Sequence, residues 1–232
     1  PIGCHPVGTI FAGGAKPKVV VLTGAGVSTG AGIPDFRSGK EGESVYSSRF
    51  KNAFDSAGFR ADPSLLWTAA RDLFGGVHDK SIRPTAVHHF VRLLHSHGML
   101  LRHYTQNVDG LDVAAGVPKD LVVECHGSMN SASCLQCGHK PAMESVWNDL
   151  VASRDSKIAP VPLCSHCGTV PYRPDVVMFG EPLPSRFHDL NGKDLAAADA
   201  ILVLGTSLVV YPFAGLLQQA PPTTPRFLFI NE

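Results

Sequence analysis

The sequence lacks an excess of charge of either sign, and it lacks long hydrophobic runs. Its 232 residues hold 20 Lys plus Arg and 20 Asp plus Glu, so no overall field attracts nucleic acid or an acidic membrane surface. Its longest apolar runs, such as Ala200–Leu204, are far shorter than the roughly 20 residues that cross a bilayer. We therefore expect neither sequence-specific nucleic-acid binding nor membrane insertion.

A secretory signal is also lacking. Residues 1–18 show no basic start followed by an apolar stretch. Four of the six cysteines fall in two C-x-x-C pairs, which is typical of metal binding in a reducing compartment. We predict an intracellular protein of the cytoplasm, nucleus or mitochondrial matrix, with residues 1–16 as a loose extension.

Short apolar runs rich in β-branched residues recur along the chain and end in Gly or polar residues. Such continuous runs suit strands covered on both faces, as in a parallel sheet flanked by helices. The predicted fold class is therefore α/β. The predicted strands are Val19–Thr23, Leu100–Thr105, Leu121–Cys125, Val176–Phe179, Ile201–Leu204 and Phe227–Ile230.

Helices are predicted between these strands and in two insertions. Apolar residues at helical spacing predict a crossover helix over Pro84–His97, with Pro84 in its first turn and Gly98 after its end. The stretch Lys40–Phe74 is polar and then mildly helical from Leu65, which indicates an inserted lid or helical module. Between Ser128 and Pro171 the strand pattern stops and the cysteines appear, which indicates a second insertion.

The first predicted strand leads into a glycine-rich turn, Gly24–Gly32. Glycines there would let backbone amides approach a pyrophosphate, and a helix N-terminus would add positive potential. Thr29 stands where the G-x-G-x-x-G fingerprint has its third Gly, so a plain tight turn remains an alternative.

An acid, an aromatic ring and a guanidinium follow this turn. Arg37 is suited to bidentate phosphate contact, and Phe36 to covering a flat ring. The structural alternative is that Asp35 pairs with Arg37 while Phe36 fills a core.

Polar residues follow other predicted strands at the edge where open parallel sheets bind ligands. Asn107 and Asp109 would suit a ribose and an amide, or simply a capped turn. His126 could serve as a general base, although any one of eleven histidines is more often structural. The remaining residues of this kind are Gln106, Val108, Gly205, Thr206, Ser207 and Asn231.

The two cysteine pairs predict one structural zinc ion bound by Cys134, Cys137, Cys164 and Cys167, since four thiolates complete a tetrahedral shell. The metal would then have no open position for chemistry. A helix over Ala142–Ser153 is expected between the pairs. A redox pair is the minor alternative, and His139 and His166 are spare ligands.

Together these motifs resemble the sirtuin family. The resemblance is carried by Gly24–Gly26, Gly32–Ser38, Thr105–Asp109, His126–Gly127, the cysteine pairs, Phe179–Glu181, Gly205–Ser207 and Asn231. It implies a Rossmann-like parallel sheet with helices on both faces, plus a smaller domain made of a zinc-binding module and a helical module. The implied division is 17–39, 84–128 and 172–232 for the Rossmann-like domain, 40–83 for the cofactor loop and helical module, and 129–171 for the zinc module. It also implies that the domain continues beyond Glu232.

The resemblance further implies an NAD-dependent protein-lysine deacetylase that releases nicotinamide and O-acyl-ADP-ribose. It assigns His126 as the base acting on a ribose hydroxyl, with Asn107 as a second catalytic residue. Matching cofactor contacts are Gly24, Ala25, Gly26, Thr29, Asp35, Phe36, Arg37, Gln106, Asn107, Val108, Asp109, Gly205, Thr206, Ser207 and Asn231. The strip pairing with the acyl-lysine peptide matches Val177, Phe179, Gly180 and Glu181.

Acyl preference and alternative activities follow from the same resemblance. Sirtuins that prefer succinyl or malonyl groups carry Tyr-x-x-Arg where this chain has Ala70 and Leu73, so acetyl or longer aliphatic groups are expected. Acylated proteins, histones among them, are the expected partners. Mono-ADP-ribosyl transfer to protein, a nicotinamide dehydrogenase and a non-enzymatic zinc-ribbon module remain alternatives.

Overall fold

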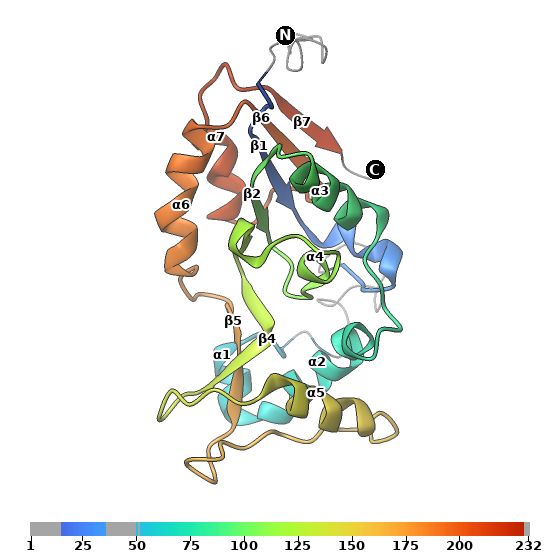
Figure 1. Cartoon of the computed structure of the whole chain (residues 1–232). Coiled ribbons are helices and arrows are strands. Elements are labelled where there is room, and N and C mark those ends of the chain that lie inside the picture. The colour runs from blue at the N-terminus through green and yellow to red at the C-terminus, as the bar shows by residue number, and fades with distance from the viewer. Residues whose placement is uncertain (1–14, 36–49, 51, 230–232) are drawn as a thin grey trace.

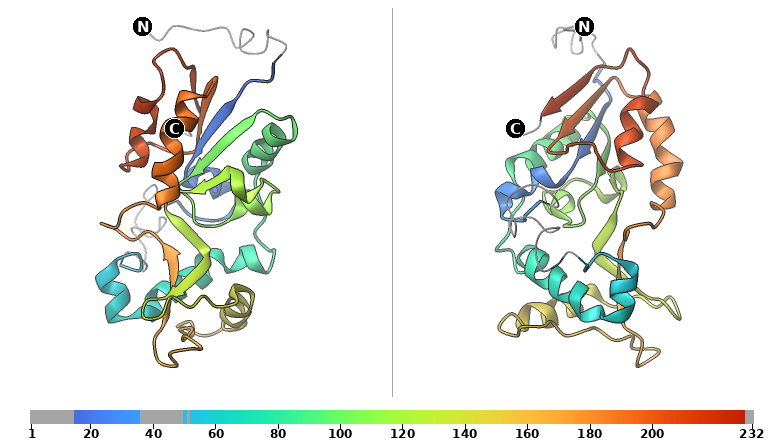
Figure 2. Two further views of the ribbon diagram at one scale, coloured as in Figure 1. Left: turned by 60° about the vertical axis from the view of Figure 1, so that its left-hand side comes forward. Right: turned by 180° about the vertical axis from the view of Figure 1, so that it is seen from behind.

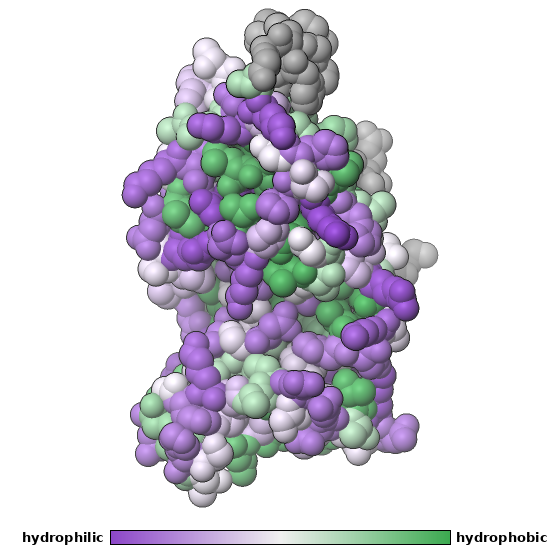
Figure 3. Space-filling model, in the orientation of Figure 1, coloured by the Kyte–Doolittle hydropathy of each residue, from purple (hydrophilic) through white to green (hydrophobic). Residues whose placement is uncertain are grey.

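The computed structural model describes residues 15–35, 50 and 52–229. Figure 1 shows two stacked parts, a sheet flanked by helices above and a smaller assembly below, joined by a long two-stranded ribbon. Hydrophilic side chains are interspersed over the face drawn in Figure 3, and hydrophobic atoms gather mainly over the upper part. Among the described residues, no helix is both long enough and apolar enough to cross a membrane.

A five-stranded sheet forms the upper part. Its strand order is β3-β2-β1-β6-β7, and every neighbouring pair is parallel. The predicted α/β class with a Rossmann-like parallel sheet is therefore confirmed. The strands are β1 Val19–Thr23, β2 Leu100–Thr105, β3 Val122–Glu124, β6 Ala200–Leu204 and β7 Arg226–Phe229.

Helices cover both faces of this sheet because successive side chains of β1 point to opposite sides. Val20 and Leu22 pack in one core with α6 (Ser185–Ala196) and α7 (Leu216–Gln219). Val19 and Val21 pack in another with α3 (Ala86–Ser96). The two views of Figure 2 show these helices on opposite sides of the sheet.

The helix α3 begins two residues later than Pro84–His97 predicts. Thr85 is its N-cap, and Thr85 and His88 form a reciprocal capping box, so Pro84 lies outside the helix. The helix ends before Gly98, whose φ of +68° only glycine adopts readily.

The smaller part has its own hydrophobic core, centred on Trp67 and Trp147. The indole of Trp67 donates to the carbonyl of Tyr172 at 3.1 Å, which ties α2 to β5. The helix α2 contains the predicted helical stretch Leu65–Phe74, and α5 is one residue shorter at each end than the predicted Ala142–Ser153. Its elements are α1 Ser56–Ala61, α2 Pro63–His78, β4 Gly127–Cys134, α5 Met143–Ala152 and β5 Tyr172–Val176.

The prediction of a parallel strand over Val176–Phe179 is wrong. The strand β5 ends at Val176 and pairs antiparallel with β4, in a separate two-stranded sheet. The apolar run continues because Val177 packs against the core of the sheet domain, whereas Met178 packs in the core of the smaller part. The run therefore bridges two cores and does not cross one sheet.

A partly buried ion pair joins α6 to the sheet. Asp194 accepts hydrogen bonds from Arg102 Nε at 2.8 Å and from the Tyr104 hydroxyl at 2.7 Å. Burial and this hydrogen bond raise the pKa of Tyr104 far above its ordinary value, so the phenol remains a neutral donor. The Asp194 carboxylate thus accepts hydrogen bonds from two polar groups that would find no acceptor in the apolar core.

Replacing Asp194 with Ala should destabilise the protein by about 1–3 kcal/mol, because the buried Tyr104 hydroxyl would lose its acceptor, while Arg102 would keep only the Asp120 carbonyl. Urea unfolding measures the change. Asp189→Ala, on an exposed position of the same helix, should change the free energy of unfolding by less than about 0.5 kcal/mol. Equal effects of the two substitutions would contradict the assignment.

Candidate functional site

The loops that follow the sheet strands meet at the carboxyl edge of the sheet. The Gly26 amide donates to the Gly205 carbonyl at 2.9 Å, which joins the loops after β1 and β6. Gln106 joins the loop after β2 to both: its backbone amide donates to the Thr23 carbonyl at 3.0 Å, and its side-chain amide donates to Thr206 Oγ1 at 2.7 Å. Residues separated by up to 183 positions therefore form one polar edge.

The glycines of the first loop are required by this loop-to-loop contact. A Cβ on Gly24 would lie 2.6 Å from Thr206 Cβ, and one on Gly26 would lie 2.9 Å from the Gly205 carbonyl oxygen. Gly205 adopts φ +58°, and a Cβ there would lie 2.6 Å from the Val27 amide nitrogen. Close backbone packing thus explains glycine at these positions, whereas the sequence had suggested close approach to a phosphate.

The expected helix N-terminus after this loop is not observed in the residues described. Two successive 3-10 turns, Ala25–Val27 and Thr29–Ala31, follow Gly24 instead. Thr29 is exposed, and its hydroxyl donates to the Gly26 carbonyl at 3.0 Å. Ala25 and Asp35 are half-buried, and Phe36, Arg37 and Asn231 lie outside the described residues.

Buried polar side chains link the loops after β1 and β2. Ser28 Oγ donates to Asp109 Oδ2 at 2.7 Å, and Asn107 Nδ2 lies 3.1 Å from Ser28 Oγ and 3.2 Å from the Gly24 carbonyl. Asp109 Oδ1 accepts from the Leu111 amide at 2.9 Å. Burial raises the pKa of Asp109, and these hydrogen bonds act against that rise. Sequence reasoning missed Ser28, although a hydroxyl placed between Gly26 and Gly30 was a signal for it.

His126 lies where β3 gives way to β4. Its Nδ1 is 3.0 Å from the Gln106 carbonyl. A carbonyl oxygen only accepts, so Nδ1 carries the proton and Nε2 keeps its lone pair. Burial lowers the pKa of His126, with the Gln106 carbonyl acting in the opposite direction. The imidazole is therefore neutral at physiological pH and has a free acceptor nitrogen.

The predicted peptide strip runs beside His126. The Val177 amide donates to the His126 carbonyl at 2.8 Å, and Phe179 is 50% exposed. Gly180 is also exposed, with φ +85°. Val108, whose carbonyl accepts from the Met129 amide at 3.1 Å, ties the loop after β2 to β4.

The Glu181 carboxylate faces inward and holds this strip in place. It accepts from Arg173, from the Ser56 hydroxyl at 2.8 Å and from the Met178 amide at 3.0 Å. Arg173 contributes most to holding the pKa of Glu181 down to about 2. Its carboxylate is thus already bound by the protein, and its neighbours Phe179 and Gly180 are the exposed part of the strip.

The loop after β6 offers polar groups to the same edge. Thr206 is occupied internally, since its Oγ1 accepts from the Gln106 side chain and from the Leu208 amide at 3.2 Å. Ser207 is exposed. The Thr29 hydroxyl and the Gln106 side chain already donate within the protein, to the Gly26 carbonyl and to Thr206 Oγ1. Their oxygen atoms remain acceptors, and together with the exposed Ser207 they suit a polyhydroxylated ligand such as NAD.

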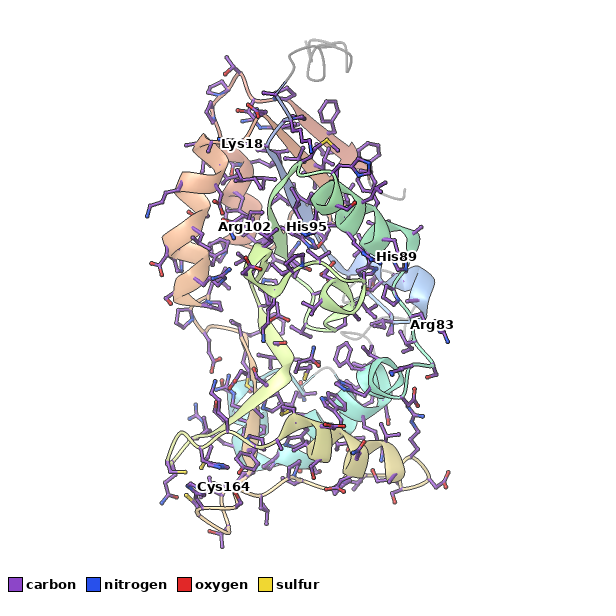
Figure 4. All side chains as sticks on the ribbon, in the orientation of Figure 1. Lys18, Arg83, His89, His95, Arg102 and Cys164 are labelled. Atoms are coloured by element: carbon purple, nitrogen blue, oxygen red, sulfur yellow. The ribbon has the colours of Figure 1, made fainter. Side chains whose placement is uncertain are left out.

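The four predicted cysteine ligands converge at the far end of the smaller part. Their Sγ atoms all lie within 4.8 Å of one another, with Cys134 to Cys167 at 3.8 Å and Cys137 to Cys164 at 3.7 Å. Tetrahedral zinc–sulfur bonds of about 2.3 Å place thiolates about 3.8 Å apart, so the cluster fits one zinc ion. Figure 4 shows Cys164 at the end opposite the sheet, far from the polar edge, which suits a structural metal.

Neither spare histidine is needed for this cluster. His139 and His166 stack with ring centroids 3.9 Å apart, and His139 Nδ1 lies 2.6 Å from the Tyr172 hydroxyl. That hydroxyl also accepts from the Ser165 amide at 3.1 Å, inside the second cysteine pair. These contacts pack the two cysteine loops against β5.

Comparisons with known proteins agree with this geometry. The family model described as "Sir2 family" matches residues 24–212. The chain belongs to the Sir2 family. Similar Sir2 relatives include mouse NAD-dependent protein deacetylase sirtuin-3, 42% identical over 94% of this chain and 63% of the relative, and NAD-dependent protein deacetylase SIR2rp1 of Trypanosoma brucei brucei, 41% identical over 93% and 60%.

The structural comparison points to the same family. A solved structure from work on the structural basis for the mechanism and regulation of Sir2 enzymes matches with a TM-score of 0.76 and 30% identity. The match covers 92% of this chain and 80% of that structure. The chain spans about three fifths of the length of the curated Sir2 relatives named above.

Replacing Cys164 with Ser should reduce bound zinc from about one ion per chain to nearly none, because three thiolates no longer close the tetrahedral shell. Metal analysis of the purified protein measures this ratio, and the thermal midpoint should fall with it. Cys125→Ala, which removes a buried thiol outside the cluster, should leave the zinc content unchanged. Full zinc occupancy in Cys164→Ser would contradict a four-thiolate site.

Proposed function

We propose that this chain is an NAD-dependent protein-lysine deacetylase that releases nicotinamide and O-acyl-ADP-ribose. The observation that carries the proposal is the fixed tautomer of His126, a neutral imidazole with a free Nε2 at the edge where the four loops meet. Support comes from membership of the Sir2 family and from relatives that are named NAD-dependent protein deacetylases.

His126 acts as the general base in this proposal. Its Nε2 takes the proton of a ribose hydroxyl, while the Gln106 carbonyl holds Nδ1–H and so fixes the ring. NAD, when bound, supplies the ADP-ribosyl acceptor of the acyl group and the nicotinamide leaving group. Because burial lowers the pKa of His126, the base remains unprotonated at pH values where a free histidine would be charged.

The loops divide the binding task. The described residues that contact NAD are Ala25, Thr29, Asp35, Gln106 and Ser207. Gly24, Gly26, Asp109, Gly205 and Thr206 shape the loops through the contacts described above. Asn107 serves both roles, since its buried amide bonds to Gly24 and Ser28 beside His126. Val108 packs against the hydrophobic core of the smaller part. The remaining cofactor contacts come from Phe36, Arg37 and Asn231.

The acyl-lysine peptide pairs with Val177, Phe179 and Gly180 as an added strand. Glu181 holds that strip in its pairing conformation. Acylated proteins, with histones among the candidates, are the substrates. The chain acts inside the cell, because cysteines that bind zinc must stay reduced. Its zero net charge provides no overall electrostatic attraction for nucleic acid.

Acetyl and longer aliphatic acyl groups are preferred over succinyl. Ala70 and Leu73 are buried in the apolar core of the smaller part, at the positions where succinyl-preferring sirtuins carry a pairing Tyr and Arg. Arg71 lies between them, but its guanidinium already donates to Asp72 at 2.7 Å and to the Ser153 carbonyl at 2.9 Å. A succinyl carboxylate would therefore be buried without a cation.

His126→Tyr should lower nicotinamide release from an acetyl-lysine peptide by about a hundredfold or more, since the base is removed. Mass spectrometry of the products should find O-acetyl-ADP-ribose with the wild type. His89→Tyr, at an exposed position on α3 that Figure 4 labels, should retain full activity. In the wild type the acid limb of kcat/KM should lie below pH 6.5, the ordinary pKa of histidine.

Two results would overturn this proposal. One is peptide-dependent nicotinamide release that survives His126→Tyr. The other is an ADP-ribosyl adduct on the peptide in place of O-acetyl-ADP-ribose, which would favour the mono-ADP-ribosyltransferase alternative.

On one peptide sequence, succinyl-lysine should be turned over with kcat/KM at least about tenfold below that of acetyl-lysine, because its carboxylate lacks a partner. Butyryl-lysine is the matched control, being of similar length without the charge, and should be accepted. Equal turnover of succinyl- and acetyl-lysine would contradict the proposed preference.

A further inference from the structure

Three buried titratable side chains from three elements converge beneath the polar edge. They are His88 of α3, His103 of β2 and Asp112 of α4 (Leu111–Ala114), with exposed fractions of 0%, 0% and 3%. Asp112 Oδ1 lies 3.6 Å from His103 Nδ1 and 4.0 Å from His88 Nε2. These three atoms face one another without a direct hydrogen bond. We call these residues the His–Asp–His cluster.

The protonation of the cluster follows from its contacts. His88 Nδ1 accepts from the Thr85 amide at 3.0 Å, so its proton is on Nε2 and points toward Asp112. A metal ion would need a lone pair on that same nitrogen, so the cluster does not suit a metal. Burial lowers the pKa of both histidines, to about 3 for His103, and both are neutral. Asp112 is thus the one group here that can carry a charge.

Each member of the cluster reaches a cofactor loop through a threonine. His88 contacts Thr85, whose hydroxyl donates to the Val27 carbonyl at 2.8 Å in the loop after β1. His103 Nε2 lies 2.8 Å from Thr23 Oγ1, at the end of β1.

The third threonine connects Asp112 to Asn107. The Thr105 hydroxyl interacts with the Asp112 carboxylate, and Thr105 Oγ1 accepts from the Asn107 amide at 3.1 Å. The Asn107 side chain then bonds to Gly24 and Ser28. The three arms therefore end at Val27 in the loop after β1, at Thr23 where β1 leads into that loop, and at Asn107 in the loop after β2.

We propose that Asp112, together with His88 and His103, positions the loops after β1 and β2 for NAD. This inference rests on the proposed function. All three are buried beneath the site edge, so they are positioning residues and act through Thr85, Thr23 and Thr105. The carboxylate is the hub because it alone faces both imidazoles and also interacts with the Thr105 hydroxyl.

The test compares Asp112→Leu and Asp112→Asn in the full chain. Asp112→Leu removes the acceptor and should raise the KM for NAD by about tenfold to a hundredfold, since small displacements of binding loops are costly. The KM for acetyl-lysine peptide should stay within about twofold, because the peptide strip lies on another element. Asp112→Asn keeps a carbonyl acceptor and should restore the KM for NAD to within about threefold of the wild type.

A second variant keeps the test decisive if Asp112→Leu does not fold. Thr105→Val is nearly isosteric and removes only the hydroxyl of one arm, and it should also raise the KM for NAD selectively. Asp120→Leu, at an exposed position, is the control and should leave both KM values unchanged. Titration calorimetry with NAD alone should show the same ranking of affinities without any turnover.

The outcomes separate the inference from the proposed function. An unchanged KM for NAD in Thr105→Val and in folded Asp112→Leu would overturn the positioning role, as would equal increases for NAD and peptide. A wild type that neither binds NAD nor releases nicotinamide would instead overturn the proposed function.

Discussion

The loops that follow β1 and β6 approach so closely that a Cβ on Gly24, Gly26 or Gly205 would collide with the other loop. Gly26 meets Gly205 backbone to backbone, with its amide on the Gly205 carbonyl, and Gly24 lies against Thr206. This contact requires glycine on both loops and depends on β1 and β6 being adjacent and in register, Thr23 beside Leu204. The side chains of Gln106 and Asn107 are placed relative to this contact, since the first bonds to Thr206 of one loop and the second to Gly24 of the other.

The second constraint is the passage of the chain between two hydrophobic cores. From Val176 to Met178 the backbone leaves the two-stranded ribbon, contributes Val177 to the core of the sheet domain, and returns Met178 to the other core. The Val177 amide bonds to the His126 carbonyl at this crossing. The imidazole and the exposed strip are thereby fixed to the same short segment. In the proposed function, this segment is what brings His126 beside the strip that would pair with the peptide.

The sequence allowed prediction of the features that depend on local pattern. The strand Val19–Thr23 is a continuous apolar run, and the cysteine spacing is chemically specific, so neither needed tertiary information. By contrast, β4 was missed because Gly127–Cys134 is made of small and polar residues with little strand propensity; its pairing with β5 stabilises it. The helix α6 was missed for a similar reason, since few of its residues are apolar.

The sequence pattern predicted loops that follow the sheet strands, but it did not predict the contacts that their side chains make. Glu181 looked like a peptide contact, but its carboxylate is occupied by Arg173 and Ser56, which lie far from it in sequence or on other elements. No sequence pattern singles out the three threonines Thr23, Thr85 and Thr105, or shows what Ser28 contacts. Their importance comes from partners that only the folded chain brings within hydrogen-bond distance.

The buried titratable groups make opposite contributions to the pH dependence of the free energy of unfolding. A histidine whose folded pKa is depressed, such as His103 at about 3, contributes stability above its unfolded value of about 6.5 that is lost as the pH falls below it. Asp112, whose pKa is raised to about 7, has the opposite effect. Its contribution to the free energy of unfolding is present at acid pH and is lost as the pH rises through 7. Between pH 3.8 and pH 6.5, the ordinary pKa values of Asp and His, the two contributions have opposite slopes and largely cancel. The cluster therefore adds little pH dependence to the free energy of unfolding over that range, although each of its buried groups taken alone would add a strong one.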